Sequence, residues 1–187
     1  VSTCGNTDHP DIQFAFLPSI VDDHTRKLHL GHGYTLHTTL MRPKSRGSVT
    51  LQSANPYQAP HIDPGFFTHP ADMAVAIKGA RMGFAVLEAK AMESYRGKRL
   101  HPFEVNDDRA MEQCLRATCD TEYHPVGTCK MGPDNDPMAV VDAQLRVLGI
   151  QNLRVVDASI MPLLISGNTN APAIMIGEKC AEFILNA

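Results

Sequence analysis

The sequence predicts an α+β fold: a mainly antiparallel sheet with flanking helices, followed by the terminal strand, loop and helix of an α/β domain. Three patterns predict it. Residues 12–53 alternate like strands, residues 70–118 carry apolar side chains at helical spacing, and residues 153–185 run as an apolar stretch, a polar loop and a helix. The chain has 187 residues and is 43% hydrophobic, enough to bury the core of one domain or slightly more.

The expected strands lie near the start of the chain and are joined by polar turns. Their residues alternate, or are rich in β-branched and aromatic side chains, over 12–20, 34–42 and 47–53. Residues 54–70 contain four prolines and a glycine, so we expect an irregular crossing there. Its apolar side chains are expected to be buried: Ile62, Phe66 and Phe67.

Two helices are expected in the middle of the chain. Apolar residues recur at helical spacing from residue 70 to about residue 94. A second helix is expected over 107–118, with an aspartate at its start and with Met111, Leu115 and Ala117 facing inward.

The C-terminal stretch follows the order strand, loop, helix. Leu153–Val156 is an apolar run that ends at Asp157, and a helix is expected from Ala171 to Leu185. Asn170 is the expected cap, and Pro172 lies in the first turn, where its missing N–H costs nothing. Because such a unit needs parallel neighbours, we expect residues 1–140 and 141–187 to belong to two different domains.

Composition excludes several classes of partner. Seventeen Lys and Arg against twenty Asp and Glu give a formal net charge of −3, which does not favour nucleic acid. No apolar run reaches the roughly 18 residues of a membrane span, so no transmembrane segment is expected. Five scattered cysteines favour a reducing compartment. We therefore expect a cytoplasmic location, either free or peripheral to the inner membrane, and we expect no metal because the His and Cys spacings fit no zinc site.

Three motifs carry candidate chemistry. His124 lies in a loop that Pro125 stiffens and Gly127 makes flexible, where an imidazole can accept a proton at neutral pH; a core histidine bonded to backbone is the alternative. Residues 166–172 precede the last helix, whose N-terminus favours negative charge, although they could simply cap it. Asp157 ends an expected strand, where ligands of α/β domains bind, or it is a turn residue.

Together these motifs resemble the C-terminal signatures of the glucose–methanol–choline (GMC) oxidoreductases. The resemblance rests on YHPVGTCKMG at 123–132, LRVVDASIMP at 153–162 and SGNTNAPAIMIGEKCA at 166–181. The segments MRPKSRGSVTL at 41–51 and HIDPGFF at 61–67 resemble the substrate domain of the same family. The match covers nearly the whole chain in the expected order.

The resemblance implies roles for individual residues. His124 matches the catalytic base that takes the hydroxyl proton of an alcohol, and Asn168 matches its partner, which is His or Asn in the family. Tyr123 is assigned to substrate binding. The cofactor is FAD, whose hydride-accepting atom is flavin N5. The cofactor-binding residues implied are Asp157, Ala158, Asn168, Thr169, Asn170 and Pro172.

One departure from the family limits what this chain can do alone. The dinucleotide fingerprint G-x-G-x-x-G is absent, and Gly31-His32-Gly33 lacks a preceding strand. The expected partner is therefore an N-terminal FAD-binding part of the same protein, without which we expect neither FAD retention nor catalysis. Aliphatic alcohols fit slightly better than choline as substrates, and the electron acceptor, a quinone or oxygen, stays open. A non-catalytic remnant that serves as a structural or interaction module is the alternative.

Overall fold

The protein folds as two compact units built from interleaved segments. The structure is a computed structural model that describes residues 1–5 and 9–186. One unit comprises residues 1–46 and 65–120, and the other comprises residues 47–64 and 121–187. Helices and antiparallel strands occur together, which agrees with the predicted α+β class. The predicted domain division at residue 140 stays a prediction.

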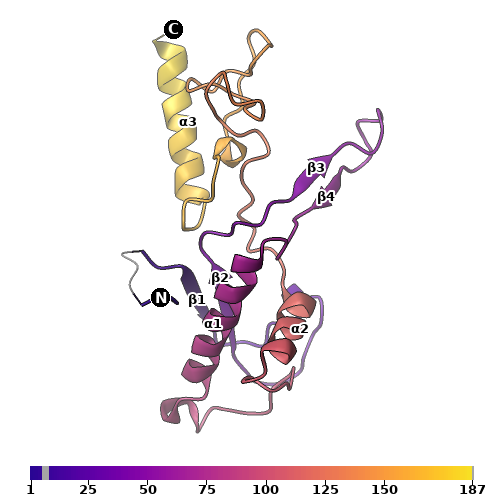
Figure 1. The fold of residues 1–187 in the computed structure, drawn as a ribbon, viewed down its shortest axis with the longest axis vertical. Coiled ribbons are helices and arrows are strands. Elements are labelled where there is room, and N and C mark those ends of the chain that lie inside the picture. The colour runs from indigo at the N-terminus through magenta and orange to yellow at the C-terminus, as the bar shows by residue number, and fades with distance from the viewer. Residues whose placement is uncertain (6–8, 187) are drawn as a thin grey trace. The chain divides into compact units, whose positions relative to one another are not determined.

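The first unit packs a helix on a two-stranded sheet. Strand β1 (Ile12–Leu17) pairs antiparallel with β2 (Thr35–Leu40), so that Ile12 lies opposite Leu40. Helix α1 (Pro70–Leu87) lies against these strands (Figure 1). A Cβ at Gly79 would come within 2.8 Å of the Ile12 side chain, so the small residue allows the close approach. Ile12 is 1% exposed and anchors this core.

Helix α1 starts as its sequence predicts but stops earlier. The His69 imidazole accepts a hydrogen bond from the N–H of Ala71, and Pro70 occupies the first helical position. The expected extension to residue 94 is wrong, because Ala89 is extended and only a single 3-10 turn, η2 (Lys90–Met92), follows. No residue of η2 is buried, so no packed face supports further turns of α1.

Helix α2 (Asp108–Thr118) confirms the second predicted helix. The Asp107 carboxylate accepts from the N–H of Arg109 at 2.9 Å and caps it. Met111 is 1% exposed, as expected. Ala117 is exposed, which corrects its predicted inward position, because it lies about 120° around the helix axis from Met111.

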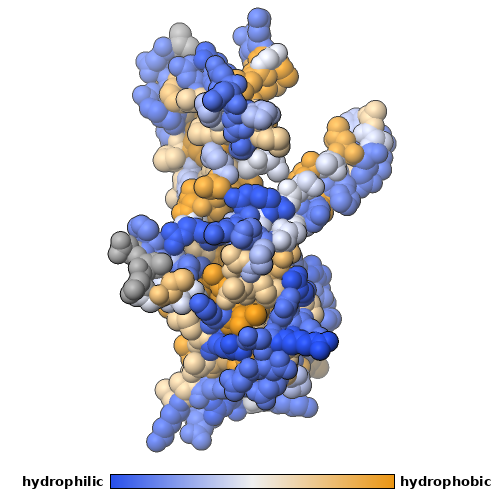
Figure 2. Space-filling model, in the orientation of Figure 1, coloured by the Kyte–Doolittle hydropathy of each residue, from blue (hydrophilic) through white to orange (hydrophobic). Residues whose placement is uncertain are grey.

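The third predicted strand joins a different sheet from the first two. Strand β3 (Ser48–Thr50) pairs antiparallel with β4 (His61–Asp63), which lies inside the stretch expected to be irregular. The described strands thus form two separate two-stranded sheets in place of one. Ile62 and Phe66 are 63% and 43% exposed, so their predicted burial is wrong in this chain. Figure 2 shows the apolar side chains along this hairpin.

The predicted strand at 153–157 does not form. Arg154 makes one isolated bridge to Arg146, and Asp157 caps the 3-10 turn η3 (Ala158–Ile160). The predicted strand needs parallel neighbours, and the described residues contain none for it. The core of this unit instead joins extended backbone to one helix through Val141, Leu145, Ile160, Met161, Ile176 and Cys180.

Helix α3 (Asn170–Leu185) confirms the last predicted helix. It begins one residue early, because Thr169 and not Asn170 occupies the cap position. The five cysteines are free thiols. Among the described residues, no helix has both the length and the apolar character needed to cross a bilayer.

The Asp72 carboxylate holds the turn before β3 onto the start of α1. Asp72 is 4% exposed and accepts from the N–H of Lys44 at 2.9 Å and of Ser45 at 2.7 Å. Burial raises the pKa of this carboxyl, but the hydrogen bonds from Ser45 and Lys44 outweigh burial and hold the pKa below its usual value.

We expect Asp72→Asn to destabilise the full-length protein by about 1–3 kcal/mol, because buried N–H groups lose a charged acceptor. A folded-state pKa below the unfolded value gives stability that is present above the unfolded pKa and lost as the pH falls through the folded pKa. The loss of unfolding free energy in Asp72→Asn should therefore be largest near neutral pH and smaller in acid. Thermal unfolding of the variant and wild type, at neutral pH and in acid, measures this loss. Asp134→Asn, at an exposed carboxylate, is the control, and equal neutral-pH midpoints for Asp72→Asn and wild type would contradict the prediction.

Candidate active site

The loop that carries His124 has an unusual backbone. Tyr123, directly before it, has φ +62°, which is the left-handed region that side chains other than glycine seldom occupy. Pro125 follows, and Gly127 has φ +90°. The proline fixes one torsion, and the glycine allows a turn that a Cβ would strain. The sequence therefore bends sharply on both sides of the imidazole.

Backbone hydrogen bonds fix this loop on the segment around η3. The N–H groups of Gly127 and Cys129 both donate to the carbonyl of Ser159, at 3.1 and 3.0 Å. The N–H of Met131 donates to the carbonyl of Ile160 at 2.7 Å. Ser159 and Ile160 therefore act as a platform for the loop. Sequence reasoning missed this function, although the tight Asp157-Ala158-Ser159 turn is visible as a cap motif.

The structure brings His124 and Asn168 together across 44 residues of chain. The Asn168 Nδ2 lies 2.7 Å from His124 Nε2. Ser166, two residues before Asn168, has φ +65°, so this second loop also contains a left-handed residue other than glycine. Both partners thus lie next to strained backbone, which persists only where the surrounding structure enforces it.

Three contacts define the protonation of the imidazole. An amide nitrogen only donates, so Nε2 accepts from Asn168 and carries no proton in the neutral ring. The proton then resides on Nδ1, which lies 3.0 Å from the hydroxyl of Thr169. A third contact, from the N–H of Thr169 to Nδ1, is 3.5 Å and would require the opposite tautomer. The Thr169 hydroxyl can donate or accept and so fits either tautomer, whereas the shortest contact, with Asn168, favours the tautomer with the proton on Nδ1.

The start of α3 presents positive charge beside this pair. The Thr169 side chain makes no capping bond. Within the described residues, the N–H groups of Asn170 and Ala171 have no acceptor. Unpaired N–H groups and the helix dipole give a helix N-terminus about half a positive charge. The site can therefore favour negative charge on a neighbouring group.

The remaining predicted site residues differ in exposure and in the contacts that they make. Tyr123 is 68% exposed. The Asp157 carboxylate accepts from the N–H of Ser159 at 2.8 Å, so it serves as a turn cap and is exposed. Ala158 is half-buried in η3, Asn170 is exposed, and Pro172 is half-buried in the first turn of α3. Side-chain hydrogen bonds join His124 to Asn168 and to Thr169.

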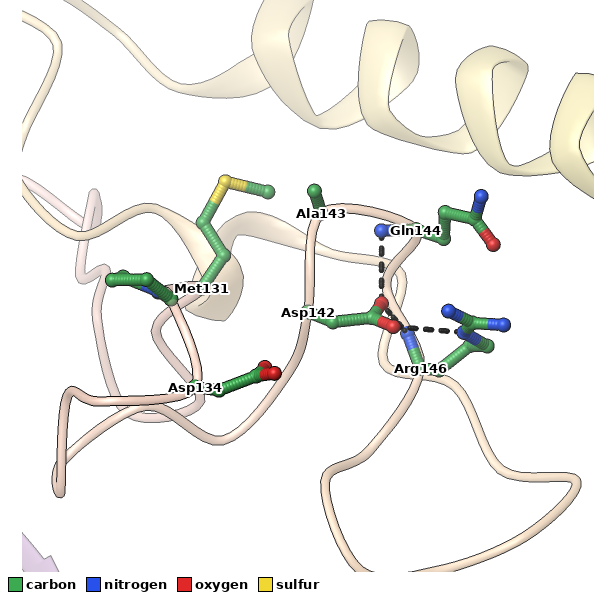
Figure 3. Close-up of a pocket in the computed structure, with 8 residues that line it drawn as sticks. Met131, Asp134, Asp142, Ala143, Gln144 and Arg146 are labelled. Carbon is green, nitrogen blue, oxygen red and sulfur yellow. Dashed lines mark hydrogen bonds and ion pairs between the residues drawn. The ribbon is translucent and has the colours of Figure 1, made fainter.

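A cavity of about 480 Å³ lies elsewhere in the same unit (Figure 3). Its lining includes Met131, Asp134 and Asp142, and none of the candidate catalytic residues. Asp142 accepts from Arg146 and from the N–H of Gln144, as the dashed lines show. Burial raises the pKa of Asp142, but the hydrogen bonds from Arg146 outweigh burial and lower the pKa. The carboxylate is therefore occupied with loop structure, and the His124 cluster remains the better candidate.

The sequence profile of the GMC oxidoreductases matches residues 43–177. The chain belongs to this family. It is 46% identical to the alcohol dehydrogenase [acceptor] of Pseudomonas putida over 186 residues, which cover 99% of this chain and 33% of that protein. It is 47% identical to the mitochondrial choline dehydrogenase of Mus musculus over 177 residues, which cover 94% of this chain and 30% of that protein. The chain thus spans about a third of the length of these GMC oxidoreductases.

Solved structures of the family share this fold. Pyridoxine 4-oxidase from Mesorbium loti superposes with a TM-score of 0.85 at 31% identity, over 95% of this chain and 35% of that one. The formate oxidase of Aspergillus oryzae RIB40 superposes with a TM-score of 0.84 at 28% identity, over 95% of this chain and 32% of that one. The predicted GMC resemblance is therefore confirmed.

We expect Gly127→Ala to loosen the His124 loop, and Gly149→Ala is its matched control. Both glycines have left-handed φ, +90° and +78°, so both substitutions should cost about 1–2 kcal/mol. Only at Gly127 does the new Cβ meet backbone, the carbonyl of Met161 at 3.4 Å. Amide hydrogen exchange over 124–131 should speed up in Gly127→Ala alone, and equal exchange in both variants would contradict this account.

Proposed function

We propose that the full-length protein is an FAD-dependent oxidoreductase that oxidises a primary alcohol to the aldehyde, with His124 as the base. One observation supports this most: Nε2 of His124 lies 2.7 Å from the Asn168 amide, beside the uncapped start of α3. A base, a hydrogen-bond donor for the alcohol oxygen and a region of positive potential are the groups that alcohol oxidation needs.

The residues present fit the flavin. The related formate oxidase carries FAD. In this chain, the acceptor-free N–H groups of Asn170 and Ala171 and the exposed amide of Asn168 suit the polar, electron-accepting edge of an isoalloxazine ring. By resemblance, Asn168, Thr169, Asn170 and Pro172 would border the ring, and Asp157 and Ala158 would border the ribityl and diphosphate groups. Bound FAD supplies a hydride acceptor at N5.

The chain's own residues handle the proton and the orientation of the substrate. On binding, the alcohol O–H would replace the Asn168 amide at Nε2 of His124, and the displaced amide would donate a hydrogen bond to the alcohol oxygen. Nε2 of His124 would take the O–H proton as the carbon–oxygen bond becomes double, and bound FAD would supply the acceptor for the hydride released from the carbon. Tyr123, which is 68% exposed and directly precedes His124, would contact the rest of the substrate.

The substrate proposal is a primary alcohol, with an aliphatic alcohol preferred to choline. The named relatives include an alcohol dehydrogenase and a choline dehydrogenase, so both substrates belong to the class. A quaternary ammonium ion requires an acidic or aromatic cage, and by resemblance the acidic residue of such a cage would lie in the N-terminal part of the protein. The N-terminal part of the protein would complete the FAD site, and a quinone or oxygen would reoxidise the flavin.

A non-catalytic remnant is the alternative function. Its sequence would be free to lose either partner of a catalytic pair. The short contact between His124 and Asn168, held by two strained loops, weighs against that alternative.

We expect His124→Ala in the full-length, FAD-loaded protein to slow alcohol oxidation by about 10²–10⁴-fold, because the hydroxyl proton loses its acceptor. Flavin content by absorbance should match wild type. His61→Ala, at an exposed histidine of β4, is the control and should leave the rate unchanged. A kcat/KM for His124→Ala equal to that of wild type at equal flavin loading would refute the proposed role.

For Asn168→Ala, we expect the limiting rate of flavin reduction to fall by about 5–150-fold, the equivalent of 1–3 kcal/mol, with a smaller change in substrate Kd. The reason is that a positioning hydrogen bond acts mainly in the transition state. Anaerobic stopped-flow measurement separates the two constants. Asn186→Ala, at the other end of α3, is the control. A weaker Kd at an unchanged limiting rate would contradict the assignment.

A further inference from the structure

Thr169 occupies a capping position without capping the helix. It directly precedes α3, is 7% exposed, and has φ −92° and ψ −1°, whereas capping residues are typically extended. Its side chain makes no bond to the helix backbone. Its hydroxyl instead lies 3.0 Å from Nδ1 of His124, 45 residues away in sequence.

Pro172 explains why the hydroxyl is available. A capping threonine accepts from the N–H of the second or third helical residue. Here the third residue is Pro172, which has no N–H. Pro172 thereby removes one of the two N–H groups that would compete with His124 for the Thr169 hydroxyl. The buried hydroxyl forms its hydrogen bond with the imidazole instead.

We propose that Thr169 is a positioning residue that fixes the tautomer and orientation of His124. The hydroxyl oxygen accepts from Nδ1–H, which leaves the lone pair of Nε2 unprotonated, directed toward the Asn168 amide and available to a substrate that replaces that amide. In histidines generally, the hydrogen bond that one ring nitrogen makes decides whether the other nitrogen is free to accept a proton. The proposal rests on the proposed role of His124, and it gives Thr169 a function distinct from the cofactor contact implied by resemblance.

The backbone N–H of Thr169 cannot take over the role of the hydroxyl. Thr169 N–H lies 3.5 Å from Nδ1, a longer contact than the hydroxyl makes. If the side chain lost its oxygen, this N–H would become the nearest polar group to Nδ1. Because an N–H only donates, it would favour the tautomer with the proton on Nε2, in which the base is already occupied. Removal of the hydroxyl should thus change the chemical state of His124 as well as its mobility.

The test compares Thr169→Val, which keeps the shape and loses the hydroxyl, with Thr169→Ser, which keeps the hydroxyl. Both are made in the full-length, FAD-loaded protein, with Thr50→Val on exposed β3 as the control. We expect the valine variant to lower the limiting rate of flavin reduction by roughly 10–100-fold with little change in KM, and to alter the pH profile of that rate. The serine variant should recover to within about threefold of wild type.

Nitrogen-15 NMR of histidine-labelled protein gives a readout that does not depend on turnover. The His124 signal is assigned by its loss in His124→Ala. We expect the Nδ1–H tautomer in wild type and in Thr169→Ser, and a shift toward Nε2–H in Thr169→Val. A wild-type protein with its proton on Nε2 would overturn the proposal, even if the valine variant failed to fold.

The failures of the two proposals are distinguishable. If His124→Ala retains full activity, the proposed function is wrong, whereas the NMR comparison still decides the tautomer. If His124→Ala is inactive and Thr169→Val matches wild type in rate, pH profile and tautomer, the positioning role alone is overturned.

Discussion

The candidate site depends on the backbone hydrogen bonds that join the His124 loop to Ser159 and Ile160. His124 and Asn168 are far apart in sequence, and each lies in a loop that could not hold its conformation alone. Ile160 belongs to the core that includes Ile176 of α3, so the platform for one loop and the helix behind the other share the same buried contacts. A substitution in that core would therefore move both partners, and the core contributes to the chemistry without touching substrate.

The features of the fold that were predicted correctly are those set by local sequence. Helix α2 has its capping Asp107, α1 has Pro70 at its first position, and α3 has Pro172 in its first turn, so the starts of these helices were predictable within a residue or two. The strands were less predictable, because a strand depends on its neighbour. Residues 61–63 form β4 only through pairing with β3, and Leu153–Val156 makes only an isolated antiparallel bridge, from Arg154 to Arg146, where a parallel partner was expected.

The candidate site shows the same division. Motif resemblance found His124 and Asn168, and the structure places them in contact. The partner of Nδ1 was not found, because Asn170 was the expected helix cap and Thr169 was assigned only to cofactor binding by resemblance. Asp157 could be assigned either to a ligand site or to a turn, and its bond to the N–H of Ser159 shows the turn role. Local sequence therefore predicts hydrogen bonds to nearby backbone better than it predicts contacts with residues that are distant in the chain.

The left-handed conformations of Tyr123 and Ser166 have a consequence for protein engineering. Glycine or asparagine would occupy those torsions with less strain, so stability screens should favour such replacements at both positions. The gain would come from relaxing the two bends that present His124 and Asn168 to each other. Selection for heat resistance and selection for turnover should therefore pull these two positions in opposite directions, and a library sorted on melting temperature alone would accumulate well-folded, poorly active variants.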